Sequence, residues 1–516
     1  METKKKKEVK RLTRRDFLKA TGGAAALAGV GVTGLVLNPR QVSATELPKK
    51  WDEEADVVII GSGFAGLAAA IEAKNAAASV VVLEKMRVPG GNSIINGGVV
   101  AAAGSPLQAE KGIKDSPELL LKDMLKAGLY LNHVHLARMV AYKSNEVVQW
   151  TINYLGVKYK KELVHLGGHS VPRSYATYNR SGSAIVNQQL KKLEKLGVKV
   201  KTGMYLKNLL RDKDGRVKGV KIREAYRFPN ENSGTIKHIK ARKAVVLAAG
   251  GFSNDITFRT LQDPKLTKDV DSTNQPGATA EVLLEALNVG ATPIQPSWIQ
   301  LGPWTSPDEK GFGIAPHFTA GVVFQYGVMV DPSTGKRFVN ELADRKTRSD
   351  AIIKTNHPAI GIADAKSAKL REAITKKLIK RGIVKEFKTL HDLAVAYKIP
   401  FQALKNTIEK YNSYLISGED KEFGRYLQKD AKPIDKSPFY AIRIWPKVHH
   451  TMGGVQINPK AQVIGLNHES IKGLYAAGEI TGGVHGAVRL GSCAVVDCLV
   501  FGRIAGKNAA AEKSWS

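Results

Sequence analysis

Asp56-Val-Val-Ile-Ile60, followed directly by Gly61-Ser-Gly63-Phe-Ala-Gly66, is the stretch that decides the fold. The apolar run predicts a buried strand, the glycines predict a tight turn, and an alanine-rich helix extends to about residue 77. A second strand over 80–83 ends at Glu84. Such glycines let the backbone approach a pyrophosphate at a helix N-terminus, and the acid reaches the ribose hydroxyls. A tight turn without a ligand is the alternative, but strand, helix and acid together predict dinucleotide binding.

The composition is that of a globular protein. The 516 residues are 43% hydrophobic and 24% charged, which excludes disordered, collagen-like and disulfide-scaffold chains and indicates two or three domains. The two cysteines, Cys493 and Cys498, form neither CxxC nor CxxCH, so we expect no metal site, iron–sulfur cluster or attached haem. Both cysteines are expected to pack in a helix rather than act as a redox pair.

Residues 1–44 are predicted to be a twin-arginine signal peptide. Arg14-Arg15-Asp-Phe-Leu-Lys19 follows Thr13, an apolar run rich in glycine and alanine comes next, and Val42-Ser-Ala44 is a small-x-small cleavage site. A membrane anchor is the alternative, but so many glycines suit a spanning helix poorly. We therefore expect a periplasmic protein with no stable membrane insertion after signal cleavage.

The chain is strongly basic, with a formal net charge of +31. Without residues 1–44, which hold ten Lys/Arg and three Asp/Glu, the net charge is +24. Such a charge favours a small acidic substrate, an acidic redox protein or a membrane surface. Export and the lack of a nucleic-acid motif argue against nucleic acid as a partner.

The remaining patterns divide the chain into a nucleotide-binding domain in two parts, 51–302 and 441–516, and a smaller inserted domain, 303–440. The inserted part is marked by aromatic loops and lysine-rich helices, and glycine motifs return after 447. The other predicted elements are helices over 115–127, 134–155, 182–196, 276–290 and 493–514, a hairpin-like segment over 199–242, a strand over 244–249 and strands near 322–330.

Further glycine motifs resemble those of one flavoprotein family. They are Gly90-Gly-Asn-Ser93, Ala248-Ala-Gly-Gly-Phe252, His449-His-Thr-Met-Gly-Gly454 and the stretch from Gly473 to Ala494. Together they are similar to the FAD-dependent fumarate reductase and succinate dehydrogenase flavoproteins, soluble flavocytochrome-c-like branch, over residues 55–510. The resemblance implies an α/β protein in which a Rossmann-like FAD-binding domain is interrupted by a smaller α+β capping domain. It also implies FAD rather than NAD.

The same resemblance implies which residues hold FAD. Besides Gly61, Gly63, Gly66 and Glu84, they are Ala65, Asn92, Ser93, Gly97, Gly98, Glu281, His450, Glu479, Ala494 and Val495. In membrane-bound relatives a histidine near the position of Asn92 carries FAD covalently. Residues 85–100 contain no histidine, so we expect non-covalent FAD.

Three residues match the catalytic positions of the family. Arg345, a few residues after Gly335-Lys-Arg-Phe-Val-Asn-Glu341, matches an arginine that protonates the α carbon while hydride from flavin N5 reaches the β carbon. Arginine is an unusual acid, so this role comes from the resemblance alone. His449 and Arg489 match a pair that clamps the substrate carboxylate, for which the arginine fork is well suited. The alternatives are an exposed salt-bridge arginine for Arg345 and a flavin-phosphate contact for Arg489.

The chain departs from the family at the other end of the substrate. Gly302, in Gln300-Leu-Gly-Pro303, stands where a histidine holds the second carboxylate, so we expect fumarate to be a poor substrate. Thr319, His165 and His317 are further candidates for substrate binding, while the roles of His169 and Arg173 stay open. Nearby aromatic residues either fill the core or favour a bulky β substituent; they are Trp298, Trp304, Phe312, Phe318, Phe324 and Tyr326.

The sequence thus predicts an exported FAD-dependent reductase of the C=C bond in a monocarboxylic 2-enoate, a methacrylate-, acrylate-, cinnamate- or urocanate-like acid. With no haem, iron–sulfur or FMN domain visible, we expect a separate periplasmic c-type cytochrome as electron donor. The alternatives are a fumarate reductase, a ketosteroid-type flavin dehydrogenase and a non-catalytic electron-transfer flavoprotein. The ketosteroid reading leaves Arg345 and Arg489 without a purpose.

Overall fold

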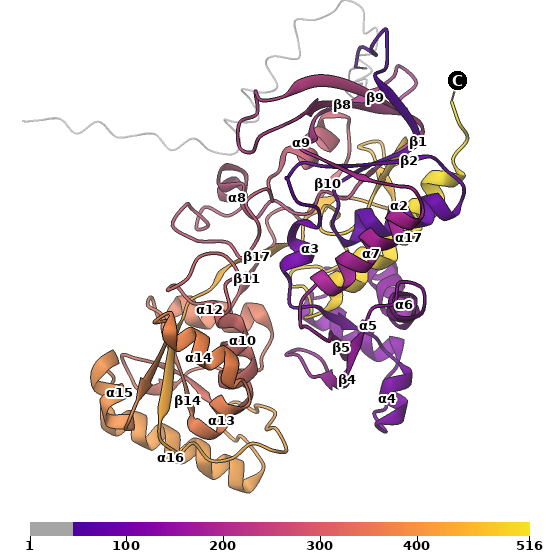
Figure 1. Ribbon diagram of the computed structural model, residues 1–516. Helices are drawn as coiled ribbons and strands as arrows, with labels where there is room; N and C mark the ends of the chain where they lie inside the picture. The colour runs from indigo at the N-terminus through magenta and orange to yellow at the C-terminus, as the bar shows by residue number, and fades with distance from the viewer. Residues whose placement is uncertain (1–44, 516) are drawn as a thin grey trace, which may run out of the picture. The chain divides into compact units, whose positions relative to one another are not determined.

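A computed structural model describes residues 45–515 of the chain (Figure 1). These residues lie in one compact unit. The predicted signal peptide, residues 1–44, lies outside the described residues.

An eight-stranded sheet forms the nucleotide-binding part. Its main path has the order β19-β20-β9-β1-β2-β6, parallel from β20 to β6, with the antiparallel hairpin β7-β8 attached to β9. The central strand β1 is buried from Val57 to Ile60, as an unbroken apolar run in a parallel sheet should be. The strands are β1 (Glu53–Ile60), β2 (Val80–Glu84), β6 (Val200–Thr202), β7 (Tyr205–Arg211), β8 (Val217–Glu224), β9 (Thr235–Leu247), β19 (Gln462–Ile464) and β20 (Ser470–Ala476).

Three helices pack side by side on this sheet. They are α2 (Phe64–Asn75), α7 (Ser183–Lys195) and α17 (Cys493–Ala511), and α2 contacts both of the others (Figure 1). The side chains of Ala68, Ala69 and Ala70 in α2 are fully buried, and such small residues allow helices to approach closely. The packing brings the first turn of α17, from the far end of the chain, to the sheet that begins with β1.

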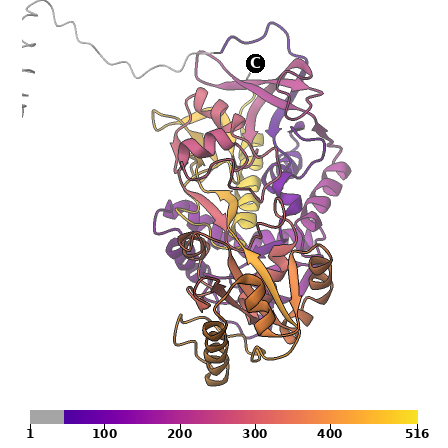
Figure 2. The ribbon, with the colours of Figure 1, turned by 90° about the vertical axis from the view of Figure 1, so that its left-hand side faces the viewer.

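The inserted part is built on an antiparallel sheet with the order β13-β12-β14-β16-β15. Figure 2 shows this sheet and its helices below the nucleotide-binding part. Its elements are β12 (Val328–Asp331), β13 (Lys336–Arg337), α12 (Arg345–Lys354), β14 (Ala359–Asp364), α13 (Ala365–Lys369), α14 (Glu372–Lys380), β15 (Val384–Phe387), α15 (Leu390–Tyr397), α16 (Phe401–Ser417) and β16 (Phe439–Ile444).

The two faces of this sheet each cover their own apolar core. Val328 and Val330 of β12 belong to one core, while Met329 between them belongs to the other. This alternation is the period of two that a strand imposes on its side chains. The inserted part is therefore an α+β unit, and β16 carries its sheet past the predicted boundary at 440.

Two short strands join the parts. β11 (Ile299–Gly302) pairs in antiparallel fashion with β17 (Lys447–Thr451), so the chain leaving the nucleotide-binding part lies beside the chain returning to it. The pairing sets Gln300 opposite His450 and Gly302 opposite Lys447. The remaining elements are α3 (Gly91–Ile95), β3 (Val99–Ala101), α4 (Pro106–Glu110), α5 (Pro117–Ala127), α6 (Val134–Asn153), β4 (Tyr159–Val164), β5 (Ser174–Thr177), α8 (Ile256–Gln262), α9 (Glu281–Asn288), β10 (Pro293–Ile294) and β18 (Gly454–Val455).

Most predicted elements are present, but the strands near 322–330 are only partly right. The stretch from Ala315 to Tyr326 is helical, as α10 (Ala315–Phe318), the π-helical turn η1 (Thr319–Val323) and α11 (Phe324–Tyr326), and the strand begins only at Val328. A short apolar run is compatible with either a buried strand or a buried helix, which explains the wrong prediction. Between residues 45 and 515, no helix is both long and apolar enough to cross a membrane.

Candidate active site

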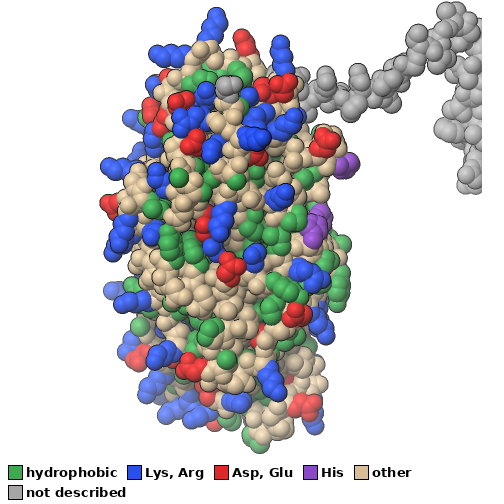
Figure 3. All heavy atoms as spheres, turned by 90° about the vertical axis from the view of Figure 1, so that its right-hand side faces the viewer, with side chains coloured by type: hydrophobic (Ala, Val, Ile, Leu, Met, Phe, Trp, Pro, Cys, Tyr) green, Lys and Arg blue, Asp and Glu red, His purple; other side chains and the backbone are tan. Residues whose placement is uncertain are grey.

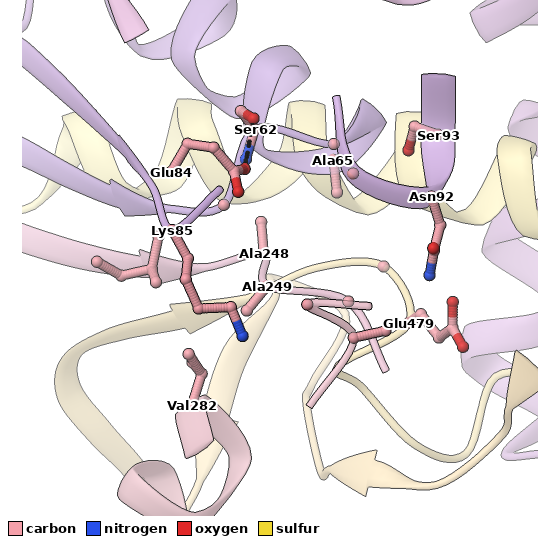
Figure 4. Close-up of a pocket in the computed structure, with 18 of the residues that line it drawn as sticks. Ser62, Ala65, Glu84, Lys85, Asn92, Ser93, Ala248, Ala249, Val282 and Glu479 are labelled. Carbon is pink, nitrogen blue, oxygen red and sulfur yellow. Dashed lines mark hydrogen bonds between the residues drawn. The ribbon is translucent and has the colours of Figure 1, made fainter. Parts of the chain in front are cut away.

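A pocket opens where β1 and β2 end, beside the first turn of α2 (Figure 4). Gly61 adopts φ of +103°, and a Cβ there would collide with the carbonyl of Ala248, so only glycine fits this turn. Eight of the residues predicted to hold FAD line the pocket: Gly61, Gly63, Ala65, Glu84, Asn92, Ser93, Glu281 and Glu479.

Glu84 is held at the end of β2 by both of its carboxylate oxygens. Oε2 accepts hydrogen bonds from the backbone N–H and the hydroxyl of Ser62, at 3.1 and 2.6 Å, and Oε1 accepts one from the N–H of Met86 at 2.8 Å. The side chain is 7% exposed. Ser62 was not predicted as a site residue, although its place within the glycine turn was a signal. The acid is thus oriented before any ribose arrives.

The pocket has further polar groups from distant parts of the chain. The hydroxyl of Ser93 accepts a hydrogen bond from the N–H of Phe64 at 2.9 Å, which ties α3 to the first turn of α2. Lys85 forms an ion pair with Glu281 at the start of α9. Neither Lys85 nor its pairing with Glu281 was predicted from the sequence.

The other predicted FAD residues do not line this pocket. Gly66 lies in α2, and Ala494 and Val495 lie in the first turn of α17. Gly97 and Gly98 connect α3 to β3. His450 is buried beside Glu479, with Nδ1 3.4 Å from the carboxylate, and burial lowers its pKa to about 4 against the opposing effect of Glu479.

The residues present fit FAD. The glycine turn supplies backbone N–H groups at the N-terminus of α2, where a pyrophosphate binds favourably. Buried Glu84 suits ribose hydroxyls, and Nε2 of His450 is buried with no hydrogen-bond partner in the described part of the chain, so it is free for a ligand. The absence of a histidine between 85 and 100 leaves no residue there for a covalent link.

Arg345 is the first residue of α12 and reaches from the inserted part to β11. Its Nη1 donates a hydrogen bond to Oε1 of Gln300 at 3.0 Å, while Nε2 of Gln300 donates to the carbonyl of Arg489 at 2.9 Å. Gln300 therefore links the two arginines predicted as proton donor and clamp. The sequence did not predict this link, because no single motif pairs residue 300 with either arginine.

His449 lies in β17, the strand that pairs with β11. Its Nδ1 is 2.8 Å from the hydroxyl of Thr273, which fixes the ring, and its imidazole packs edge-on against Trp304 with ring centroids 5.0 Å apart. The guanidinium carbon of Arg345 lies 4.4 Å from the centroid of the Trp304 ring. The structure thus gathers Arg345, His449 and Arg489 around Gln300 and Trp304.

The two arginines, Arg345 and Arg489, form no ion pair with a carboxylate in the described part of the chain. Arg489 is 5% exposed, the one hydrogen bond of its side chain within residues 45–515 is a long contact of 3.4 Å to the carbonyl of Leu490, and its Nε has no partner in that range. No Asp or Glu of the described chain forms an ion pair with Arg345 or Arg489. Buried cations normally have a counter-charge, so this arrangement suits an anionic ligand.

Burial shifts the pKa values of all three groups downwards, and repulsion from neighbouring cationic groups adds to the shift for Arg345 and His449. Burial lowers the pKa of Arg489 to about 10, against the opposing effect of the Glu479 carboxylate. Burial, helped by the charges of Arg489 and Arg348, lowers the pKa of Arg345 well below its usual value. The same two effects, with Arg345 and Arg489 as the charges, keep the pKa of His449 far below 6.5, so its imidazole is neutral at pH 7. An anion bound here would reverse these shifts.

The other candidate substrate residues have mixed surroundings. Thr319 in η1 is fully buried, and its hydroxyl has no partner within the described range. His165 contacts the carbonyl of His169 through Nε2 at 2.7 Å and packs against Tyr426. His317 packs against Phe312, away from any contact with the two clamp residues. The structure therefore groups none of these three with Arg345 through a hydrogen bond.

His169 and Arg173, whose roles were open, belong to a buried network. Arg173 forms ion pairs with Asp115 at 2.9 Å and Asp123 at 2.6 Å, and its Nη1 donates to Nδ1 of His169 at 3.0 Å. Nε2 of His169 then donates to the carbonyl of Gly491 at 2.8 Å. The network supports the segment that follows Arg489 and does not contact the pocket.

Three of the six aromatic residues predicted near the site, Trp304, Phe318 and Phe324, belong to the core of the inserted part. Phe318 and Phe324 are 0% and 1% exposed and pack inside the inserted part, so they do not form a substrate wall. Cys493 and Cys498 are free thiols in α17; Cys493 is buried in the core as expected, whereas Cys498 is only partly buried and lines the pocket. No cluster of His, Cys, Asp or Glu in the described residues could hold a metal ion.

The fold and the glycine-lined pocket define a dinucleotide-binding flavoprotein. The FAD binding domain family model matches residues 56–495 of the chain, and the chain belongs to this family. It is 42% identical to the acrylate reductase flavoprotein subunit of Shewanella woodyi, covering 96% of this chain and 98% of that protein. It is 32% identical to the urocanate reductase of Eggerthella lenta, covering 95% of this chain and 80% of that one.

A solved structure agrees with these relatives. The open conformation of a flavocytochrome c3 fumarate reductase superposes with a TM-score of 0.72 at 31% identity, covering 98% of this chain and 83% of the other. The predicted likeness to the fumarate reductase flavoproteins and the predicted α/β fold with FAD are confirmed. The chain is an FAD-dependent oxidoreductase of the fumarate reductase type.

Proposed function

We propose that the protein reduces the C=C bond of an α,β-unsaturated monocarboxylic acid. The observation that carries this proposal is the group of Arg345, His449 and Arg489, in which neither arginine forms an ion pair with an acid among residues 45–515 and Nε of Arg489 has no hydrogen-bond partner there. A single carboxylate supplies the missing counter-charge. The relatives are named as reductases of acrylate, urocanate and fumarate, and these names support an enoate as the substrate.

Each residue has a step in this reaction. Reduced FAD, when bound, supplies a hydride to the β carbon. Arg489 and His449 hold the carboxylate and stabilise the negative charge that develops on it. Arg345 donates the proton to the α carbon, and its lowered pKa makes it a stronger acid than a free guanidinium. Gln300 keeps Arg345 in place through the hydrogen bond to Nη1.

The second carboxylate of fumarate has no partner in this arrangement. Gly302 offers no side chain, and its neighbour in the site is the indole of Trp304. Burying a carboxylate without a hydrogen-bond donor is strongly unfavourable. A monocarboxylic acid therefore fits better than fumarate, which is the alternative substrate.

The test is a screen of 2-enoates as oxidants of the viologen-reduced protein. We expect acrylate-like acids to reoxidise it fast and fumarate to do so slowly. Fumarate turning over fastest would replace the monocarboxylate with the fumarate reductase alternative. A neutral enone turning over while all acids fail would favour the ketosteroid-type dehydrogenase, and no turnover with any acceptor would favour an electron-transfer flavoprotein.

The electron donor in this proposal is a separate periplasmic c-type cytochrome. Lys and Arg side chains are spread over the whole face seen in Figure 3 rather than gathered in one patch, in keeping with the net charge of +24. Such a surface steers an acidic protein towards it, and salt screens the attraction. The rate of reduction by an acidic c-type cytochrome should fall as salt rises; a rate independent of salt would contradict this partner.

Export by the twin-arginine route completes the proposal. The support is the sequence from Arg14 to Lys19 followed by the apolar run and the cleavage site at Ala44. Replacing Arg14 and Arg15 with lysine should leave the flavoprotein in the cytoplasm, because the paired arginines are the receptor-read signal. Unchanged periplasmic activity of that variant would contradict the export route.

A further inference from the structure

The space beside Gly302 is occupied by an aromatic ring. Gly302 ends β11, and a Cβ at this position would lie 3.4 Å from Cζ2 of Trp304 and 3.5 Å from Cβ of His449. Contacts of this length are ordinary for a single methyl group. A side chain at position 302 would therefore begin in direct contact with the indole.

The indole is held in place on several sides. Trp304 is 8% exposed and belongs to the core of the inserted part. The Arg345 guanidinium stacks over its ring at 4.4 Å, and His449 packs against it edge-on at 5.0 Å. Because Gln300 also anchors Arg345, the ring is confined between the proton donor and the clamp. Moving Trp304 would disturb both.

We propose that Trp304 is the residue that restricts the site to enoates with a compact, uncharged group at the end away from the clamped carboxylate. This inference rests on the proposed function and adds the residue that sets its selectivity. The indole fills the volume next to Gly302 and His449, which leaves little room there for a phenyl or imidazole substituent. The uncharged indole also supplies no positive charge of its own to pair with a second carboxylate.

The test compares four variants with the wild-type protein on acrylate, fumarate and cinnamate. Trp304→Ala opens the volume and Trp304→Phe keeps most of it filled while removing the indole N–H. Gly302→His adds a carboxylate partner into the occupied space, and the double variant Gly302→His/Trp304→Ala adds it into the opened space. The readout is the ratio of kcat/KM between substrates, because a general loss of activity leaves this ratio unchanged.

We expect Trp304→Ala to raise the cinnamate-to-acrylate ratio of kcat/KM by about tenfold or more. Changes of this size are typical when a pocket gains room for an additional apolar substituent. Trp304→Phe should keep the wild-type ratios. Gly302→His alone should lose activity on acrylate, and the double variant should raise the fumarate-to-acrylate ratio above that of Trp304→Ala.

Two results would overturn the inference. The first is an unchanged ratio in a Trp304→Ala protein that retains full flavin content. The second is a wild-type protein that already prefers fumarate and loses that preference in Trp304→Phe, which would make the indole N–H the partner of the second carboxylate. If Trp304→Ala does not fold, Trp304→Leu provides the same comparison. A wild-type protein inactive on every enoate would instead refute the proposed function.

Discussion

Replacing Arg489 with methionine should weaken substrate binding and at the same time stabilise the protein. Methionine keeps the unbranched stem but removes a buried charge that has only one long hydrogen bond, 3.4 Å to the carbonyl of Leu490. The lost bidentate contact to a carboxylate is worth about 1.5–3 kcal/mol, which corresponds to a roughly 10–150-fold higher Kd.

The gain in stability follows from the pKa. Burial lowers the pKa of Arg489 from 12.5 to about 10, so holding the charged form at pH 7 costs the fold about 3 kcal/mol. Because pH 7 lies below both values, the whole of this cost applies and disappears in Arg489→Met. The free energy of unfolding in the absence of substrate should therefore rise by up to about that amount.

Arg337→Met is the matched control. Arg337 in β13 is as buried as Arg489, but it forms ion pairs with Glu341 at 2.6 Å and Asp420 at 2.8 Å. Removing it leaves buried carboxylates without this partner, which typically costs about 3–5 kcal/mol. Urea denaturation without substrate and titration of acrylate by flavin absorbance give both quantities. An Arg489→Met protein that is destabilised like Arg337→Met and binds acrylate normally would refute the role of Arg489 as an anion clamp.

Three further predictions test other parts of the site. Arg345→Ala should abolish turnover but leave substrate titration of the oxidised protein nearly unchanged, and Arg345→Lys should recover some turnover because lysine still donates a proton; near wild-type reoxidation of Arg345→Ala would show that another group is the acid. Flavin should stay in solution when the protein is precipitated with acid, whereas yellow precipitate would mean a covalent link. The pKa of His169 is lowered to about 3, first by burial and then by Arg173, so its contribution to stability is complete above pH 6.5 and is lost as the pH falls below it. Between pH 7 and 4.5 the free energy of unfolding, measured in urea, should fall by about 3 kcal/mol more for the wild-type protein than for His169→Gln. Equal losses would mean that His169 takes up a proton as readily in the folded as in the unfolded protein.

The nucleotide-binding part could be predicted because its signals are local. The strand, the turn at Gly61 and the helix after it are adjacent in sequence, and Glu84 follows at the end of the next strand. Their physical requirements, a tight turn and an acid near the ribose, are met by residue types that the sequence shows directly. Dependence on local signals also explains why the strands predicted near residues 322–330 were only partly right. The buried apolar run in this region carries no local sign that it is helical.

The surroundings of the residues proposed as catalytic could not be predicted in the same way. Arg345, His449 and Arg489 were recognised by resemblance, but Gln300 and Trp304 act through contacts between segments far apart in sequence. These contacts depend on how the inserted part packs on β11 and β17. His165 and His317 illustrate the converse, because these two candidates for substrate binding form no hydrogen bond with Arg345 or Arg489 in the described chain.

The central claim is that the protein transfers a hydride and a proton to the C=C bond of a monocarboxylic enoate. The most direct measurement mixes anaerobically reduced protein with acrylate or with fumarate in a stopped-flow instrument and follows flavin reoxidation, with the product identified by mass spectrometry. We expect fast reoxidation by acrylate, one saturated acid formed per flavin, and much slower reoxidation by fumarate. Reoxidation by fumarate at the faster rate, or reoxidation by acrylate without a saturated product, would contradict it.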